Sequence, residues 1–266
     1  MPRSTLSVAL ITLNEEDNLS RTLASVRFAD EIVVVDSGST DRTVEIAKSF
    51  KTKVFLEDWK GFARQKNSAI DKCTGTWVLS LDADEELTEE LQAEIRGMLE
   101  VDERTTPQVD GYRLRLRHVF LGRWMRYGGY YPDIKLRMFR RVTRSGVAHF
   151  TDRPVHESVQ VDGRVETLTK DFLHHGYPNL ELYLEHMNRY SSLGASLVAA
   201  KGKVSRSWPA FLWNVALVPM LTFVWNYGFR LGFLDGREGL LLHLYHSAYI
   251  SWKYAKAWQI GRGSKP

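Results

Sequence analysis

Apolar and polar positions form alternating blocks along the first hundred residues. Short apolar runs are typical of buried strands, and each is followed by a stretch whose apolar residues recur at helical spacing. This alternation predicts a mostly parallel sheet with right-handed crossovers. The predicted strands are Leu6–Thr12, Glu31–Val35, Val54–Leu56 and Trp77–Leu81, and the predicted helices include Leu19–Val26, Gly61–Ile70 and Leu91–Leu99.

The period of the pattern changes to two between Asp110 and Asp171. In Tyr112–Leu116 apolar residues alternate with arginines, which indicates a strand with one solvated face. Gly122–Tyr131 is rich in glycine and aromatic residues and is predicted to be an ordered loop over a site. Lys135–Arg141 alternates again. We expect these segments to pack as antiparallel strands onto the edge of the first sheet.

The C-terminal third is helical and rich in aromatic residues. Leu180–Leu197 has the spacing of an amphipathic helix, and Ala210–Trp225 is strongly apolar but shorter than the ~20 residues of a spanning helix. Tryptophans and lysines here favour a membrane interface. We expect helices that lie in the inner leaflet, with a helical cap or a dimer interface as alternatives. The predicted parts of the chain are 1–109, 110–178 and 179–266.

Composition narrows the class of protein only slightly. The chain has 266 residues and a net charge of +4, which fits phosphorylated ligands or an anionic membrane surface. Cys73 is the single cysteine, so no intrachain disulfide is possible. The N-terminal stretch lacks the layout of a signal peptide, so we expect this part of the protein in the cytosol. We expect no nucleic-acid partner, and the oligomeric state leaves no signal in the sequence.

The stretch Val78–Glu86, VLSLDADEE, brings two carboxylates to the end of a predicted strand. Asp82 and Asp84 would point the same way if the strand continued. Two such oxygen donors can hold Mg2+ or Mn2+ against a phosphate. The alternative is that these acidic residues end a strand and begin a helix near Thr88.

Further polar residues follow the ends of the other predicted strands. Thr12, Asn14 and Glu15 follow the first strand, and Asp36 follows the second. Ligands bind at this edge of an open α/β sheet. The sequence contains neither a GxGxxG after the first strand nor a P-loop, so phosphates would have to be bound by a cation and scattered side chains. Helix capping is the alternative for Asn14 and Asp41.

Four stretches resemble the family 2 glycosyltransferases: ALITLNEEDNL, EIVVVDSGSTDRT, WKGFARQKNSAI and WVLSLDADEEL. Within that family they are most similar to the β-1,4-glucosyltransferases that act on a heptose of lipopolysaccharide cores. The resemblance implies an α/β GT-A fold, with a Rossmann-like, mostly parallel central sheet, an antiparallel acceptor-side extension and C-terminal helices. It also implies a nucleotide-sugar donor, a divalent cation (Mg2+ or Mn2+) and inversion at the anomeric carbon.

The resemblance also implies roles for single residues. Asp36 would read the base or ribose, Asp82 would lie near the ribose and diphosphate, and Asp84 would coordinate the metal. We expect Lys66 to lie on a solvated helix face. The other residues expected to contact the nucleotide are Thr12, Asn14, Glu15, Arg64, Gln65 and Asn67.

Inverting transfer needs a base that takes the proton of the acceptor hydroxyl. Glu157, in the sequence VHE, is similar in position to the acceptor-side acid of the family. The alternative is an exposed glutamate paired with Arg153. His156 would orient Glu157 or touch the acceptor, and a purely structural histidine is the alternative.

A third ligand to the cation would come from the sequence FLHHGY. His174 is the first choice, and His175 is the alternative. Lys135 and Arg137 would meet an acidic, phosphorylated acceptor, unless they belong to a solvated strand face.

These observations predict transfer of a hexose, glucose from UDP-glucose, to an inner-core sugar of lipopolysaccharide such as heptose. A lipid-linked saccharide acceptor would place the enzyme at the cytoplasmic face of the inner membrane. Transfer to polyprenyl phosphate or to another cell-envelope glycan is the alternative reaction. A membrane-bound nucleotide-sugar binding protein is the alternative without catalysis.

Overall fold

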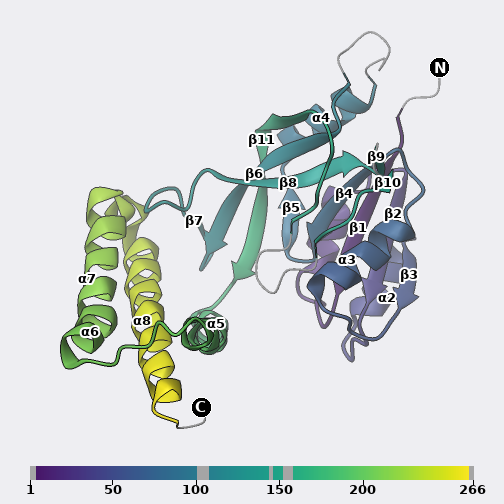
Figure 1. The fold of residues 1–266 in the computed structure, drawn as a ribbon. Helices are drawn as coiled ribbons and strands as arrows, with labels where there is room; N and C mark the ends of the chain where they lie inside the picture. Colours follow the sequence, from purple (N-terminus) through teal and green to yellow (C-terminus); the bar gives the residue numbers. More distant parts are fainter. Residues whose placement is uncertain (1–3, 101–107, 144–145, 152–157, 264–266) are drawn as a thin grey trace. The chain divides into compact units, whose positions relative to one another are not determined.

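The computed structural model describes residues 4–100, 108–143, 146–151 and 158–263, and the chain divides into two units. The first unit contains the chain up to Leu116 and Asp133–His175, and the second contains Arg117–Pro132 and the chain from Gly176 on. Figure 1 shows their elements.

Parallel strands form one half of the sheet in the first unit, as the alternating pattern predicted. Their order is β3-β2-β1-β4, and all three neighbouring pairs are parallel. Thr12 lies opposite Asp36, and Ile11 lies opposite Asp82, so the polar residues that follow these strands meet at one edge. The elements are β1 Leu6–Thr12, α1 Leu19–Ser25, β2 Glu31–Asp36, α2 Thr43–Ser49, β3 Lys53–Leu56, α3 Phe62–Asp71, β4 Trp77–Asp82 and α4 Glu89–Leu99.

Antiparallel strands extend this sheet beyond β4, as expected. Leu79 of β4 lies opposite Met138 of β8, and the order continues β8-β6-β11-β5. Apolar side chains from both halves, among them Leu10, Leu79, Met138 and Phe172, are buried in one core cluster. The GT-A fold predicted from the sequence is therefore confirmed. The added strands are β5 Glu85–Leu87, β6 Gly111–Phe120, β7 Arg123–Trp124, β8 Asp133–Arg140 and β11 Val165–Tyr177. The strands β9 Val142–Thr143 and β10 Gly146–Val147 pair with each other in a separate small sheet.

The strand that carries the acidic pair does not continue through it. β4 ends at Asp82, a turn follows, and β5 begins at Glu85. The hydroxyl of Thr22 donates to the carbonyl of Ala83 at 2.6 Å and fixes this turn. Asp82 and Asp84 therefore do not line one face of an extended strand. The helix start expected near Thr88 is confirmed, because its side chain accepts from the N–H of Leu91 and caps α4.

The second unit is built mainly from helices. Phe120, Met125, Tyr183 and Leu242 form its buried cluster. The helical run Trp208–Phe229 has 22 residues and is long and apolar enough to cross a membrane by length and composition alone, so our expectation of a shorter run was wrong. Its elements are α5 Leu180–Ala200, α6 Trp208–Leu212, the π-helical turns η1 Trp213–Leu217 and η2 Val224–Phe229, α7 Val218–Phe223 between them, η3 Gly232–Asp235 and α8 Gly236–Gly261.

The glycine-rich loop Gly122–Tyr131 is ordered by contacts within the second unit. The carboxylate of Asp235 accepts from the N–H groups of Arg126 (3.2 Å) and Tyr127 (2.8 Å). The N–H of Gly128 donates to the carbonyl of Arg230 at 2.9 Å. Backbone groups of the loop are thus paired with residues more than a hundred positions later in the chain.

Unfolding should depend on pH through His243, which is 1% exposed. Burial lowers its pKa from 6.5 to about 4; His246 adds to this shift and Asp235 opposes it. The unfolded chain takes up this proton at a higher pH than the folded protein does. The free energy of unfolding should therefore keep its full value above pH 6.5 and should fall as the pH decreases toward 4. The slope should reach at most about 1.4 kcal/mol per pH unit. Urea unfolding of the wild type and of His243→Gln across this range measures it, and equal slopes would contradict the assignment.

Candidate active site

The loops after β1 and β2 are tied together by side chains that the sequence had placed at the sheet edge. The Asp36 carboxylate accepts from the Thr12 hydroxyl (2.8 Å), from the Ser39 hydroxyl, and from the N–H groups of Gly38 (3.0 Å) and Ser39 (2.8 Å). A carboxylate has about four acceptor positions. Asp36 is thus buried, and its hydrogen bonds fix the backbone of the loop that follows β2.

Asn14 and Glu15 join the same two loops. The N–H of Asn14 donates to the Ser39 hydroxyl (2.8 Å), and its side-chain oxygen accepts from the N–H of Thr40 (2.9 Å). Asn14 has a φ of 55°, a left-handed conformation that asparagine tolerates well. The N–H of Glu15 donates to Thr43 (2.7 Å). Asp41 accepts from the N–H of Thr43 at the start of α2, which fits the capping interpretation.

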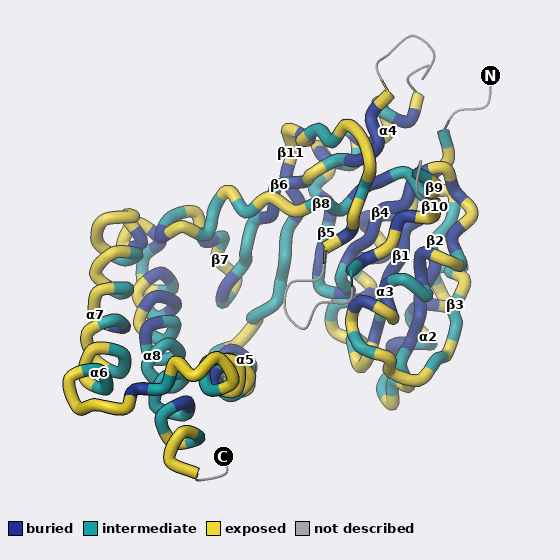
Figure 2. The backbone as a smooth tube through the Cα atoms, viewed as in Figure 1, coloured by how far each residue is buried: buried dark blue, intermediate teal, exposed yellow. Residues whose placement is uncertain are grey.

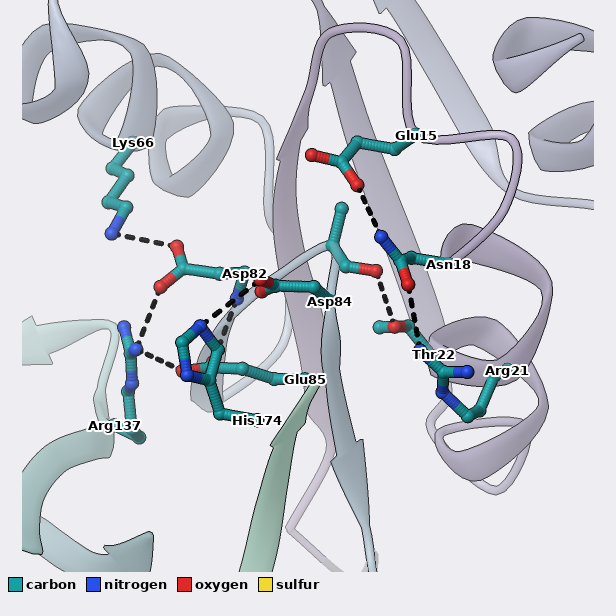
Figure 3. A network of polar contacts seen from close by, with 11 residues as sticks. Glu15, Asn18, Arg21, Thr22, Lys66, Asp82, Asp84, Glu85, Arg137 and His174 are labelled. Carbon is teal, nitrogen blue, oxygen red and sulfur yellow. Dashed lines mark hydrogen bonds and ion pairs between the residues drawn. The ribbon is translucent and has the colours of Figure 1, made fainter. Parts of the chain in front are cut away.

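A network of buried charges lies where β4 ends (Figure 3). Lys66 Nζ is 2.9 Å from Asp82 Oδ1, and Arg137 Nη2 is 2.8 Å from Asp82 Oδ2. Arg137 also pairs with Glu85, whose other oxygen accepts from the N–H of Asp82 at 2.9 Å. Lys66 and Arg137 are only 6% and 11% exposed, and Glu85 is 1% exposed. Two cations and two carboxylates therefore neutralise one another, and only the Asp82 side chain, which is 35% exposed, reaches solvent to a larger extent.

These contacts shift the two carboxyl groups in opposite directions. Burial alone would raise the pKa of Asp82, but Lys66 and Arg137 outweigh it and hold that pKa far below its ordinary value. Burial raises the pKa of Glu85 to about 7; the charge of Asp82 adds to the shift and Arg137 opposes it. Asp82 thus stays ionised at neutral pH, whereas Glu85 keeps its proton to a higher pH than an exposed glutamate would.

The expectation that Lys66 lies on a solvated face was wrong. Its side chain lies on the inner side of α3, beside the end of β4, and pairs with Asp82. Sequence reasoning also missed Glu85, to which it gave no role of its own. The sequence offered one hint, the alternation of Glu85 and Leu87 with Glu86 directly after Asp84. In the structure this alternation is a short strand in which Glu85 and Leu87 are buried.

Asp84 meets a histidine on the neighbouring strand. His174 of β11 lies opposite Glu85 of β5, and its Nε2 is 3.1 Å from Asp84 Oδ2. His175, the next residue, has its Nε2 2.8 Å from Glu86 Oε2. Successive side chains of a strand point to opposite faces, which separates the two histidines. Of the two alternatives, His174 is thus the one whose side chain contacts the Asp84 carboxylate.

The Asp84–His174 pair fits a divalent cation. Burial lowers the pKa of His174, but its hydrogen bond to Asp84 and the charges of Asp84, Glu85 and Asp82 raise it to about 9. Without a metal, His174 therefore holds a proton next to Asp84, and it would have to give up that proton to ligate a cation. In the described ranges, no group of three or more His, Cys, Asp or Glu side chains is placed to hold a metal. Mg2+ commonly takes one or two protein carboxylates and completes its shell with substrate phosphates and water.

Glu15 faces the same region from the loop after β1. Burial raises its pKa, and the charges of Asp84, Asp41 and Asp82 add to this effect, while a hydrogen bond from Asn18 opposes it. Figure 3 shows its carboxylate directed toward Asn18, whose amide donates at 3.1 Å. Glu15 thus adds negative potential beside Asp84.

The residues of α3 divide between the core and a neighbouring segment. Gln65 is fully buried and accepts from the N–H of Lys60 at 3.3 Å, whereas Arg64 is exposed. Asn67 accepts from the N–H of Phe150 (2.7 Å) and donates to its carbonyl (3.0 Å). The structure therefore gives Asn67 a positioning contact with the chain before residue 151.

The predicted acceptor-side residues are placed only in part. His156 and Glu157 lie outside the described residues. On either side of them, the N–H of Thr151 donates to the carbonyl of Ser158 at 3.1 Å. Lys135 is 46% exposed and pairs with Asp133 at 3.0 Å, so the structure leaves it outside the network that contains Arg137.

Replacing Arg137 with methionine should destabilise the protein by about 3 kcal/mol, because it leaves Glu85 buried without its cation. This loss of stability should lie near the lower end of the range for a broken buried ion pair, because Glu85 can take up a proton and so lose its charge. Lys135→Met, two residues away on the same strand, removes only an exposed pair and should cost less than about 1 kcal/mol. Urea unfolding at pH 7 compares them, and equal losses would contradict the assignment.

Comparison with known proteins identifies the family. The family model described as glycosyl transferase family 2 matches residues 7–158, more than half of the chain. The chain belongs to glycosyl transferase family 2. The matched range includes all of the Asp36, Asp82 and Asp84 segments.

Two relatives extend the glycosyltransferase match beyond that range. An uncharacterized glycosyltransferase of Rickettsia typhi is 32% identical over 214 residues, covering 74% of this chain and 69% of the relative. The lipopolysaccharide core biosynthesis glycosyltransferase LpsC of Rhizobium meliloti is 28% identical over 270 residues, covering 96% of this chain and 95% of LpsC. The glycosyltransferase is therefore similar to LpsC through the C-terminal third as well.

Solved structures agree on the fold. A mannosyltransferase from Pyrobaculum calidifontis, in complex with GDP-Man and Mn2+, superposes with a TM-score of 0.53 at 15% identity. The match covers 97% of this chain and 88% of the mannosyltransferase. At this identity the likeness supports the GT-A architecture and not the choice of sugar.

Proposed function

We propose that this glycosyltransferase moves glucose from UDP-glucose, with inversion, onto a heptose of the lipopolysaccharide inner core. The observation that carries the proposal is the Asp84–His174 pair beside the buried charge network at the carboxyl edge of the sheet. The similarity to LpsC over nearly the whole chain supports the class of acceptor.

On the donor side, the chain positions charges around the place where a diphosphate would bind. Lys66 and Arg137 hold Asp82 ionised and fixed in orientation, and Asp84 and His174 would hold Mg2+ or Mn2+. When bound, the cation offsets negative charge on the leaving nucleoside diphosphate. The loops that contain Thr12, Asn14, Glu15 and Asp36 would form the wall that meets the nucleoside.

On the acceptor side, the proposed base is Glu157. The acceptor hydroxyl oxygen forms a bond to the anomeric carbon as the bond from that carbon to the diphosphate oxygen breaks. The hydroxyl proton passes to the Glu157 carboxylate, and the nucleoside diphosphate leaves with the bonding electrons. Attack from the face opposite the leaving group inverts the anomeric centre. Asn67 supports this side by holding the backbone of Phe150.

A lipid-linked acceptor would be met at the cytoplasmic face of the inner membrane. The name of the relative LpsC refers to lipopolysaccharide core biosynthesis. We therefore propose that the enzyme works while associated with this membrane face.

A transfer assay tests the proposal. The wild-type protein is incubated with Mn2+, a heptose-terminated core acceptor and one of UDP-glucose, UDP-galactose or ADP-heptose. We expect UDP release and a hexose-extended product with UDP-glucose, with the opposite anomeric configuration to the donor by NMR. Product from ADP-heptose alone would overturn the donor, and extension of polyprenyl phosphate in place of the heptose acceptor would overturn the acceptor.

A further inference from the structure

One face of the helical run Trp208–Phe229 carries a straight apolar stripe. After residue 209, the exposed positions occur in adjacent pairs at a regular interval of four. None of them is charged or polar, and none packs in the interior. The stripe, as we use the term, consists of Trp208, Leu212, Trp213, Ala216, Leu217, Met220, Leu221, Val224, Trp225, Gly228 and Phe229.

The two π-helical turns explain why this stripe does not wind around the helix. In an α-helix with about 3.6 residues per turn, a repeat of four drifts steadily around the axis. The π turns Trp213–Leu217 and Val224–Phe229 hold more residues per turn, so they rotate the repeat back. The apolar face therefore stays on one side for roughly 30 Å.

The opposite face of the same run packs against α8. The Ser251 hydroxyl donates to the carbonyl of Val215 at 2.7 Å, and the rings of Phe211 and Trp258 are 5.0 Å apart. Polar residues avoid the stripe: the Asn214 amide donates to Ser205 at 3.0 Å. Figure 2 shows α6 and α7 mostly in the colours of exposed and intermediate residues, whereas α8 carries more buried positions. The run is thus entirely apolar toward solvent, and its few polar side chains lie on the faces turned away from the stripe.

Charge around the stripe has one sign. From residue 186 to residue 234 the sequence contains no aspartate or glutamate, but it contains five arginines and lysines. Lys201, Lys203 and Arg206 are exposed just before the stripe, and Arg230 is exposed just after it. Both ends therefore present cations beside exposed tryptophans, the combination that favours anionic lipid head groups.

We propose that the stripe lies flat in the interface of an anionic bilayer, with Trp208–Phe229 parallel to the membrane plane. Such a helix buries its apolar face about 5–10 Å into the boundary between head groups and acyl chains. The proposal rests on the membrane association proposed above and deepens it, because it names the surface of the second unit that binds lipid. It depends on neither donor nor acceptor.

Packing argues against a spanning arrangement of the same helix. α8 contacts α6, η1, α7 and η2, and α5 contacts α8, so a run that crossed the bilayer would bring both neighbours with it. α8 carries Arg237, Glu238, Lys253 and Lys256. Each charge near the bilayer centre costs about 2.5–3.5 kcal/mol on insertion scales, which equals a loss of roughly a hundredfold or more. The flat arrangement leaves these charges in water.

Vesicle flotation of the full-length protein, without donor or acceptor, tests the surface. We expect binding to vesicles that contain phosphatidylglycerol and weaker binding to phosphatidylcholine alone. Leu217→Glu should reduce the partition coefficient at least about tenfold, and each of Lys201→Ala and Lys203→Ala about fivefold. Leu193→Glu, at an exposed leucine of α5 outside the stripe, is the matched control and should bind like the wild type.

Depth measurements separate the flat arrangement from a span. Because Cys73 is buried, a fluorescent label can be directed to single cysteines introduced at Leu212, Met220 or Gly228. We expect equal quenching by lipid-attached quenchers at all three sites. Deeper quenching at Met220 than at the two ends would overturn the proposal in favour of a span.

Two further outcomes would overturn the proposal. The first is that folded wild-type protein fails to bind any vesicle. The second is a dimer, stable in the presence of vesicles and lost in Leu217→Glu, which would assign the stripe to a second copy of the chain. Because transfer to a soluble core acceptor can be measured separately, failure here would remove the proposed membrane association and leave the proposed transfer reaction intact.

Discussion

Replacing Asp84 with alanine should abolish cation-dependent donor binding and reduce transfer by about a thousandfold or more. The substitution removes the carboxylate that contacts His174 at 3.1 Å, and so removes the proposed cation ligand from the end of β4. Calorimetric titration with UDP, UDP-glucose, UDP-galactose and ADP-heptose, with and without Mn2+, measures the loss of binding. A transfer assay measures the loss of rate.

Two matched variants make this experiment specific. Asp84→Asn keeps the shape of the side chain and removes its charge, so it should behave like the alanine variant. Glu86→Gln removes a carboxylate two residues away that pairs with His175 instead, and it should retain Mn2+-dependent binding. If Asp84→Ala bound the donor as the wild type does, the assignment of Asp84 as a cation ligand would be refuted, and the acidic turn would have only a structural role. A folded wild type that binds none of the four ligands would refute the donor assignment.

Replacing Glu157 with glutamine should reduce transfer about 10²- to 10⁴-fold while donor affinity stays near the wild-type value. The amide cannot accept the hydroxyl proton of the acceptor, but it leaves the donor side unchanged. Initial rates with UDP-glucose and a heptose acceptor give the first quantity, and calorimetry with UDP gives the second.

The control for this variant is a carboxylate on β11 with no proposed role. Glu166 is partly exposed and pairs with Arg164, and Glu166→Gln should transfer at the wild-type rate. Full activity of Glu157→Gln would refute the base assignment. It would favour a phosphate acceptor such as polyprenyl phosphate, whose oxygen needs no base to attack the anomeric carbon.

The sheet and its polar edge were predictable because they follow from local patterns. Each parallel strand is an apolar run between turn residues, and right-handed crossovers leave few arrangements for such units. The carboxyl ends of β1 and β2 then meet, and the contact between Thr12 and Asp36 follows from their opposed positions.

The charge network was not predictable, because its members come from distant parts of the chain. Arg137 reaches Asp82 through the pairing of β8 with β4, which joins residues 55 positions apart. In the sequence, Arg137 is one of several basic residues that alternate along a strand. Nothing local distinguishes it from Lys135, which is exposed.

The histidine choice and the membrane segment depended on details of backbone geometry. Once β11 is known to place His174 opposite Glu85, strand alternation separates it from His175. The register of that antiparallel pair has no signature in either segment alone. Likewise, the length of the membrane segment was underestimated, because the helical run continues through Asn214 in a π turn and through Pro219 in α7. The exposed apolar residues of this run recur at an interval of four, but this interval could be recognised only once the structure showed which residues are exposed.

Asp235 has a practical consequence for how this enzyme can be shortened. Its carboxylate binds the backbone of Arg126 and Tyr127, and Arg230 binds that of Gly128. Truncation after residue 178 would remove the apolar C-terminal third and, with it, these hydrogen-bond acceptors. It would also remove the Tyr183 and Leu242 side chains, which pack in the cluster around Phe120. The loop Gly122–Tyr131 would then lack the contacts that fix its conformation. Solubility is therefore better sought by changing side chains on the stripe than by deleting the helices.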